Sequence, residues 1–172
     1  ISFWIKHTDV DLSSSTWVYG VDAQDEIFIR SSTKNISYQY QLNNAGWGSQ
    51  IPVSMQRDPS AWYHIVCAVD TTDGTAASRV KLYVNGSQVT SLATATYPSA
   101  DADTGFNENV AHDIGRSAAD AQYFDGYMSD VYFIDGTQYA ASDFGETDDN
   151  GVWIPKAASV TFGTNGFKLE FQ

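Results

Sequence analysis

The sequence contains a single cysteine, Cys67, in 172 residues. One thiol excludes an internal disulfide, and it disfavours both the cysteine-rich secreted scaffolds and the structural zinc sites that need several cysteines. Cys67 lies inside the apolar run 65–69, and the sequence places no base beside it. We therefore expect a buried, unreactive side chain.

Basic residues are also scarce. The chain has 9 lysines and arginines against 21 acidic residues, which gives a net charge of −12. A surface of this sign repels nucleic-acid phosphates and anionic membrane headgroups, so we expect neither as a partner. Most of the acidic residues are aspartates, which favour turns and also supply the hard oxygen ligands that calcium prefers.

Long apolar runs are absent, and so is helical periodicity. No segment is long and apolar enough to insert into a membrane, and no signal peptide or initiator methionine is present. The chain starts on residues 1–5, which already read as a strand, so we expect a piece of a longer polypeptide. The segment 140–144 is the one short helical turn that the pattern predicts.

Short β-branched and aromatic runs recur between turn-forming clusters, which predicts an all-β antiparallel sandwich or barrel. Asn85-Gly86 predicts a tight hairpin, and Asp135-Gly136 predicts a second turn. Residues 97–110 read as a surface loop. The predicted strands are 2–6, 16–21, 26–31, 36–42, 62–69, 79–84, 87–91, 111–115, 126–134, 152–154, 159–162 and 166–171.

Three segments follow one another in an order known from one family. They are Phe3 to Lys6, then Trp62 to Val66 with Val80 to Gly86, then His112 to Arg116 with Phe124 to Val131. The order resembles laminin G-like and pentraxin-like domains of the concanavalin A-like lectin and glucanase superfamily. The resemblance implies a jelly-roll sandwich that spans residues 1–172 as one domain.

The C-terminal part carries a narrower resemblance. Ser142 to Asp148, Gly151 to Lys156 and Phe162 to Phe167 are similar to a marine-phage version of this domain, found in large virion structural proteins. This resemblance implies a position on the surface of a virus particle. The implied partners are other virion proteins or further copies of the chain.

The glutamates argue against an enzyme. Hydrolases of the resembled superfamily carry Glu-x-Asp-x-x-Glu on one strand, so that two carboxyl groups reach one cleft. The four glutamates here, Glu26, Glu108, Glu146 and Glu170, are far apart in sequence, and no nucleophile motif such as Gly-x-Ser-x-Gly appears. We expect no catalytic residues.

Sugar binding needs exposed aromatic faces with polar groups near them. Trp47 lies between two glycines after a strand that carries Tyr38 and Tyr40 on one face, so these three residues are the candidate carbohydrate contacts. Packing within the sheet is the alternative interpretation for both tyrosines, and for Trp47 packing on the sandwich rim or contact with a neighbouring subunit is the favoured alternative. Trp4 and Trp62 lie in core-like strands, and we expect both to be buried.

Calcium is common in the resembled family, where loop oxygens bind it. The candidate ligands are Asp101, Asp103, Asn107 and Asp113, with Glu108 and Asn109 between them. Their spacing is not that of an EF-hand, and a solvated acidic loop is the alternative interpretation. Asp22, Asp25 and Glu26 form a weaker second set. For the histidines we expect hydrogen-bonded strand positions at His64 and His112, and a solvated side chain at His7.

The sequence thus leads to three functional hypotheses. The first is a non-catalytic structural or assembly module of lectin-like fold on a phage tail, fibre or capsid. The second is a host-adhesion domain that binds cell-surface glycans. The third is a glycan-processing enzyme, which the dispersed glutamates disfavour.

Overall fold

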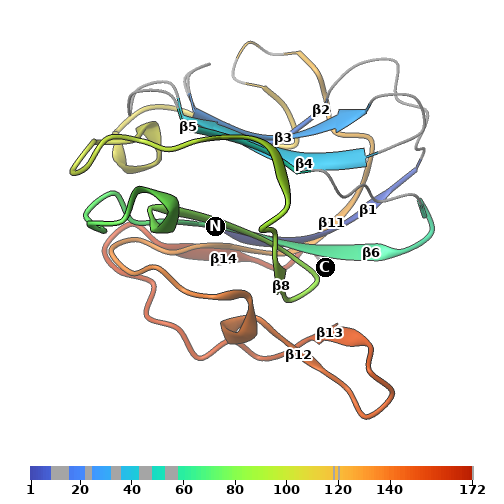
Figure 1. Cartoon of the computed structure of the whole chain (residues 1–172). Helices are drawn as coiled ribbons and strands as arrows, with labels where there is room; N and C mark the ends of the chain where they lie inside the picture. Colours follow the sequence, from blue (N-terminus) through green and yellow to red (C-terminus); the bar gives the residue numbers. More distant parts are fainter. Residues whose placement is uncertain are drawn as a thin grey trace.

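A computed structural model describes most of the chain, which folds into two stacked β-sheets (Figure 1). It describes residues 1–8, 16–21, 25–31, 36–42, 48–52, 58–117, 119 and 121–171. Within these, it describes the backbone alone for residues 25–31, 36–39, 41–42, 48–52 and 107. Among the described residues, no helix has both the length and the apolar character that crossing a membrane requires.

The first sheet, sheet A, has its six strands in the order β14-β11-β1-β6-β7-β8, all antiparallel. Its two central strands are buried along nearly their whole length, so both faces of this sheet are covered there. The strands are β1 (Ser2–His7), β6 (Trp62–Val69), β7 (Val80–Val84), β8 (Ser87–Gln88), β11 (Gly126–Phe133) and β14 (Phe167–Leu169).

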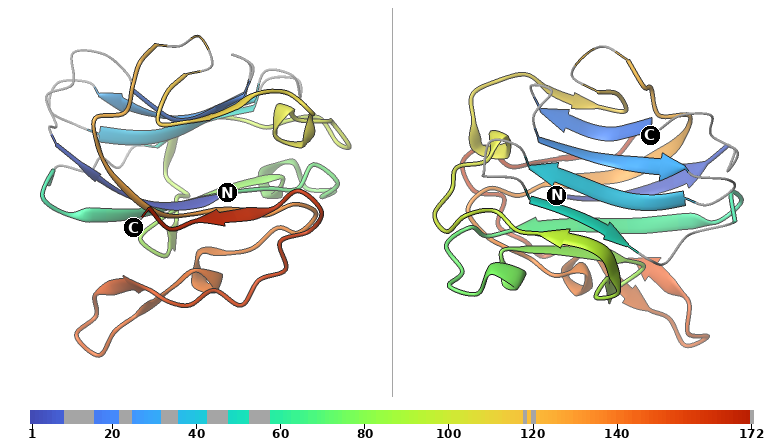
Figure 2. Two further views of the ribbon diagram at one scale, coloured as in Figure 1. Left: turned by 180° about the vertical axis from the view of Figure 1, so that it is seen from behind. Right: turned by 45° about the horizontal axis from the view of Figure 1, so that its top comes forward.

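The second sheet, sheet B, has the order β10-β2-β3-β4-β5-β9 and is also antiparallel throughout. The two sheets lie one above the other in the rear view of Figure 2 (left), as they do in Figure 1. The strands are β2 (Thr16–Val21), β3 (Asp25–Ser31), β4 (Ile36–Leu42), β5 (Gly48–Pro52), β9 (Leu92–Thr96) and β10 (His112–Ile114).

The main core fills the space between the sheets. Residues such as Phe3, Ile5, Ile65 and Leu82 of sheet A are at most 1% exposed and face Val18 and other apolar residues of sheet B. Cys67 belongs to this core and is 1% exposed, which confirms the predicted burial. Burial also raises the pKa of its thiol to about 11, so the side chain is a protonated hydrophobic residue at neutral pH.

A second, smaller core lies on the outer face of sheet A, below it in Figure 1. Val66, Ala68 and Tyr132 of the sheet pack there against the segment that follows β11. That segment contains a 3-10 turn, η3 (Ala141–Asp143), and a two-stranded ribbon formed by β12 (Gly145–Thr147) and β13 (Trp153–Pro155). The predicted helical turn at 140–144 therefore exists as a 3-10 turn, like η1 (Ala76–Ser78) and η2 (Gly105–Asn107).

The sandwich prediction and most of the strands are confirmed. Asn85 and Gly86 have φ values of 46° and 79°, so the hairpin between β7 and β8 has the positive φ at both central positions that its sequence predicts. The strands β5, β9 and β12 were not predicted, because Gly, Pro, Ala and Glu in them weaken the β pattern. Residues 159–162 form no strand; Val160 and Phe162 pack on the second core without pairing.

Two burial predictions are wrong. Trp62 is 42% exposed, because it faces outward at the start of β6, beyond the area that the C-terminal segment covers. His7 is only 2% exposed, and its ring lies against Tyr63 and Phe124 instead of in solvent. Trp4 is buried as predicted, at 7% exposed.

Candidate functional site

A pocket of about 440 Å³ opens where one edge of sheet A meets one edge of sheet B. The β10–β2 edge forms one wall and the β14–β11 edge the other, with the loop 97–111 at the rim. In the rear view of Figure 2, β14 is the red strand on the near side of the lower sheet. The pocket is lined by Tyr19, Phe106, Glu108, Asn109, Val110, His112, Phe133, Asp135, Asn165 and Phe167.

Aromatic rings form the floor of this edge pocket. Phe133 lies between Tyr19 and Phe167, with ring centroids 6.3 and 5.7 Å away and interplanar angles of 19° and 13°. Phe106, from the loop, packs against Tyr19 at 5.7 Å. Stacking of this kind holds the floor rigid and adds stability beyond the area that the rings bury.

His112 and Tyr19 form one polar pair in the pocket. The Tyr19 hydroxyl is bonded to His112 Nδ1, and His112 Nε2 is 3.3 Å from the carbonyl oxygen of Glu108. Burial raises the pKa of Tyr19, so its hydroxyl keeps its proton and donates to Nδ1. Nε2 then carries the imidazole proton and donates to Glu108. The prediction of a hydrogen-bonded His112 is confirmed.

Asp135 and Asn165 form the polar wall on the opposite side. The backbone N–H and the side-chain amide of Asn165 both donate to Asp135 Oδ2, at 3.2 and 3.1 Å. Within the described part of the chain, Asp135 Oδ1 takes no hydrogen bond. The carboxylate is thus held in one orientation while one of its oxygens is available to a ligand.

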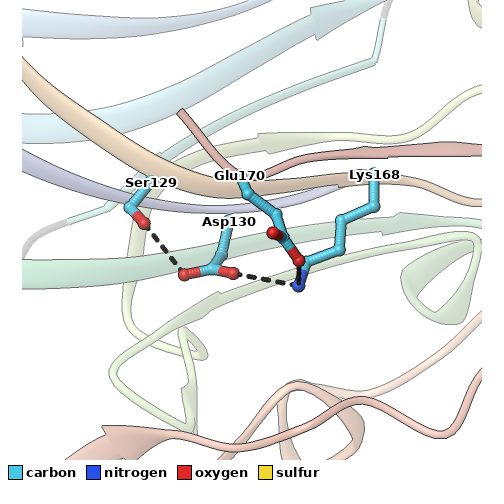
Figure 3. A network of polar contacts seen from close by, with 4 residues as sticks. All are labelled: Ser129, Asp130, Lys168 and Glu170. Atoms are coloured by element: carbon cyan, nitrogen blue, oxygen red, sulfur yellow. Dashed lines mark hydrogen bonds and ion pairs between the residues drawn. The ribbon is translucent and has the colours of Figure 1, made fainter. Parts of the chain in front are cut away.

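A charged network fixes β14, which carries Phe167 into the pocket (Figure 3). Lys168 Nζ lies 2.6 Å from Glu170 Oε1 and 3.4 Å from Asp130 Oδ1, and Ser129 Oγ donates to Asp130 Oδ2 at 2.9 Å. The Glu170 bond, with smaller contributions from Tyr132 and Asp130, holds the pKa of Lys168 above its usual range. Asp130 has a φ of 49° at a bulge in β11, which turns its carboxylate toward β14.

Of the three residues predicted to contact carbohydrate, the structure describes the side chain of Tyr40 alone. Tyr40 is fully buried in the main core, because its face of β4 points toward sheet A, so its ring offers no surface to a sugar. Tyr38 lies on the same strand, where the structure describes the backbone alone. Trp47 lies outside the described residues, and a role for it stays a prediction.

The predicted calcium residues do not assemble into a site in the described part of the chain. There, no three His, Cys, Asp or Glu side chains, Asp101, Asp103 and Asp113 included, form a group that could hold a metal ion. Asp113 is instead paired with Arg116 at 2.8 Å. Asn107 is described by its backbone, Asp22 lies outside the described residues, and Asp25 and Glu26 lie on β3. Calcium binding by either set therefore stays a prediction.

The residues that shape the pocket are mostly ones that the sequence did not indicate. Asp135 and Asn165 each precede a glycine and were interpreted only as turn residues. Phe167 was interpreted as one side of an alternating strand. The rim residues Glu108 and Asn109 lie in the loop whose acidic and amide side chains predict a calcium site, so this loop is where the sequence signal comes nearest to the pocket.

The order and pairing of the strands, with the match to known families, decide what this fold is. The family model described as the concanavalin A-like lectin/glucanases superfamily matches residues 1–142. The chain belongs to the concanavalin A-like lectin/glucanase superfamily. No curated protein matches the chain at a significant level.

The limits of the match divide the edge pocket in two. Tyr19, Phe106, His112, Phe133 and Asp135 lie inside the matched residues. Asn165 and Phe167 lie beyond residue 142 and reach the pocket because β14 pairs with β11. Since the superfamily includes both lectins and glucanases, membership supports a lectin-like binding or structural module and does not by itself distinguish binding from hydrolysis.

Proposed function

We propose that this chain is a non-catalytic carbohydrate-binding module and that the edge pocket holds a sugar unit. The observation that carries the proposal is the oriented Asp135–Asn165 pair beside the aromatic floor of Phe133 and Phe167. A sugar ring has apolar C–H faces that pack on aromatic rings and hydroxyls that donate to carboxylates. The pocket volume of about 440 Å³ lies within the usual range for small-ligand sites.

A lack of catalysis is part of the proposal. Two carboxylates, Asp135 and Glu108, line the pocket, but Asp135 is held by the two Asn165 bonds. Glu170 is bonded to Lys168, and Glu146 lies on β12 below the opposite face of sheet A. The paired glutamates of one strand that retaining hydrolysis uses are thus not found among the described residues at this pocket.

The first prediction concerns glycan binding by the intact chain. On a glycan array followed by titration calorimetry, Asp135→Ala is expected to weaken the best ligand by about 10-fold or more, because a bond to a charged acceptor is worth ~1.5–3 kcal/mol. Phe167→Ala is expected to weaken it similarly by removing part of the aromatic floor.

The matched control is Tyr127→Ala, which removes a 61% exposed ring outside the pocket and should leave binding unchanged. Equal binding by wild type and Asp135→Ala would place the ligand elsewhere. Release of reducing sugar from a bound polysaccharide would contradict the non-catalytic part of the proposal.

A second candidate function is packing against neighbouring copies or other virion proteins on a particle surface, as the marine-phage resemblance implies. The observation that favours it is a row of cross-strand neighbours on the outer face of sheet A. Lys6 pairs with Trp62 on one side and with Tyr127 on the other, and both aromatic side chains are largely exposed. Exposed aromatic residues are enriched in protein interfaces.

Self-association tests this second function directly. If the row packs against another copy, sedimentation at rising concentration will show oligomers that the double variant Trp62→Ser/Tyr127→Ser does not form. An interface of this kind should bury more than about 1,000 Å². A wild-type chain that stays monomeric at high concentration would argue against packing between copies.

A further inference from the structure

The chain beyond the family match folds back onto the outer face of sheet A. We call residues 143–162 the strap; it contains β12 and β13 and lies below sheet A in Figure 1. Phe144, Trp153, Val160 and Phe162 of the strap pack on Val66, Ala68 and Tyr132 of the sheet. The strap therefore covers an apolar area that the superfamily sandwich would otherwise expose.

One histidine of the sheet meets the strap directly. Trp153 Nε1 donates to His64 Nδ1 at 3.0 Å, and the two rings stack with centroids 6.0 Å apart and planes at 22°. Because Nδ1 accepts this bond, the imidazole proton is on Nε2, which donates to Ser2 Oγ at 2.8 Å. The His64 ring also stacks on Trp4, at 4.9 Å and 19°. Both ring nitrogens of this fully buried side chain are thus occupied.

Trp153 is packed closely against two glycines. A Cβ atom on Gly86 would lie 2.6 Å from the indole ring, and one on Gly145 would lie 2.7 Å from it. On the other side, the backbone N–H of His64 donates to Asn85 Oδ1 at 2.8 Å, which ties β6 to the hairpin. Neither ring has room to turn away from the other while the strap is docked.

Among the residues that the structure describes, no charged side chain bonds to the His64 ring. The side chains that contact its ring are uncharged: Ser2 and Trp4 from β1, and Phe144 and Trp153 from the strap. Burial alone lowers the pKa of His64 to about 4. The titratable and charged side chains on β1, β6, β7, β11 and the strap are Lys6, His7, Tyr63, Cys67, Lys81, Tyr83, Tyr127, Asp130, Tyr132, Asp143, Glu146, Asp148, Asp149 and Lys156.

We propose that His64 is an acid-operated latch that releases the strap when its ring takes up a proton from solvent at Nδ1. Protonation places a second N–H opposite the Trp153 N–H, so an acceptor becomes a donor and the bond is lost. It also leaves an imidazolium buried among uncharged groups, which is unfavourable until the strap moves and water reaches the ring. No covalent bond forms or breaks, and the proton returns to solvent when the strap closes.

The direction and size of the effect follow from proton linkage. With the strap docked, burial lowers the pKa of His64 to about 4 from its usual value of 6.5, and this pKa rises back towards 6.5 as water reaches the ring of the released form. The released form therefore binds the proton more tightly, and the docked fraction falls as the pH drops from 6.5 towards 4. A difference of this size shifts the ratio of docked to released strap by roughly 300-fold in total. Release uncovers Val66, Ala68 and Tyr132, an apolar face available only in acid.

Hydrogen–deuterium exchange of the intact chain tests the latch, with rates corrected for the intrinsic effect of pH. Between about pH 7 and pH 4.5, exchange in 143–162 is expected to rise on the order of 100-fold, while β1 and β6 stay protected. His64→Gln, which does not titrate here, should lose this pH dependence. His7→Gln, which changes a histidine outside the strap contact, should keep it.

Three results would overturn the proposal. The first is exchange that rises equally in the strap and in the sheets, which would indicate global acid unfolding. The second is an unchanged pH dependence in His64→Gln or, if that variant does not fold, in Trp153→Phe, which keeps the ring but removes the N–H donor. The third comes from nitrogen-15 NMR of the wild-type chain at neutral pH, if His64 carries its proton on Nδ1.

Discussion

Gly163→Ala is expected to lower the free energy of unfolding by ~3 kcal/mol or more, although the substitution adds a single methyl group. Gly163 has a φ of 76°, and a Cβ atom there would lie 2.1 Å from the Asp135 carbonyl oxygen. The backbones at Asp135 and Gly163 cannot easily move apart, because the Asp135 N–H donates to the carbonyl oxygen of Phe162, the residue before Gly163, at 2.9 Å. The substitution should therefore also disturb the Asp135–Asn165 pair and weaken any ligand of the edge pocket.

Gly136→Ala is the matched control for this variant. Gly136 has nearly the same φ, 81°, but nothing lies within 4 Å of the position that its Cβ would take. It should therefore lose only the ~1 kcal/mol that a positive φ costs a residue with a side chain. Urea denaturation of both variants measures the difference. Equal losses of unfolding free energy in the two variants would show that a Cβ atom at position 163 fits beside Asp135 without a clash.

The stability of the whole domain is expected to fall in mild acid, in part because of His7. Burial lowers the pKa of His7 to about 4 from the model-compound value of 6.5, so the folded chain binds fewer protons than the unfolded chain between these values. Its contribution is intact above pH 6.5 and is lost as the pH falls towards 4. The full loss is about 3 kcal/mol, since each pKa unit corresponds to about 1.4 kcal/mol.

Urea denaturation at several pH values between about 7 and 4 measures this slope. His7→Phe keeps a ring against Tyr63 and Phe124 and removes the titrating group, so its unfolding free energy should vary less with pH than that of the wild type. Thr8→Ala, a change at the exposed neighbour, should keep the wild-type slope. An identical slope in His7→Phe would show that His7 is not protonated on unfolding in this range.

Short-range sequence patterns correctly predicted the strands and turns whose conformation depends on neighbouring residues. Runs of β-branched and aromatic residues at 2–6 and 62–69, with an Asn-Gly turn between the next two strands, were enough to place β1, β6 and the β7–β8 hairpin. The same reasoning failed for Trp62 and His7. Alternation states which side chains share a face, but what covers that face is decided by segments far away in the sequence.

The edge pocket could not be predicted for the same reason. Asp135 and Asn165 are 30 residues apart, and Tyr19 and His112 are 93 apart. Each pair meets because β14 adds to β11 and β10 adds to β2, and no short-range signal specifies these edge pairings. The glycines that follow Asp135 and Asn165 correctly indicated turns, but they carry no information about which residues the turns face.

Composition and period-two patterning by themselves determined that this protein is an antiparallel sandwich with a buried thiol and an acidic surface. Those properties depend on residue type and nearest neighbours, which the sequence states directly. Only the tertiary structure decided that His64 lies between two tryptophans and that Phe167 completes an aromatic floor. Both arrangements depend on the path of the chain after residue 142, because contacts between distant segments arise only when their strands are paired and their faces covered.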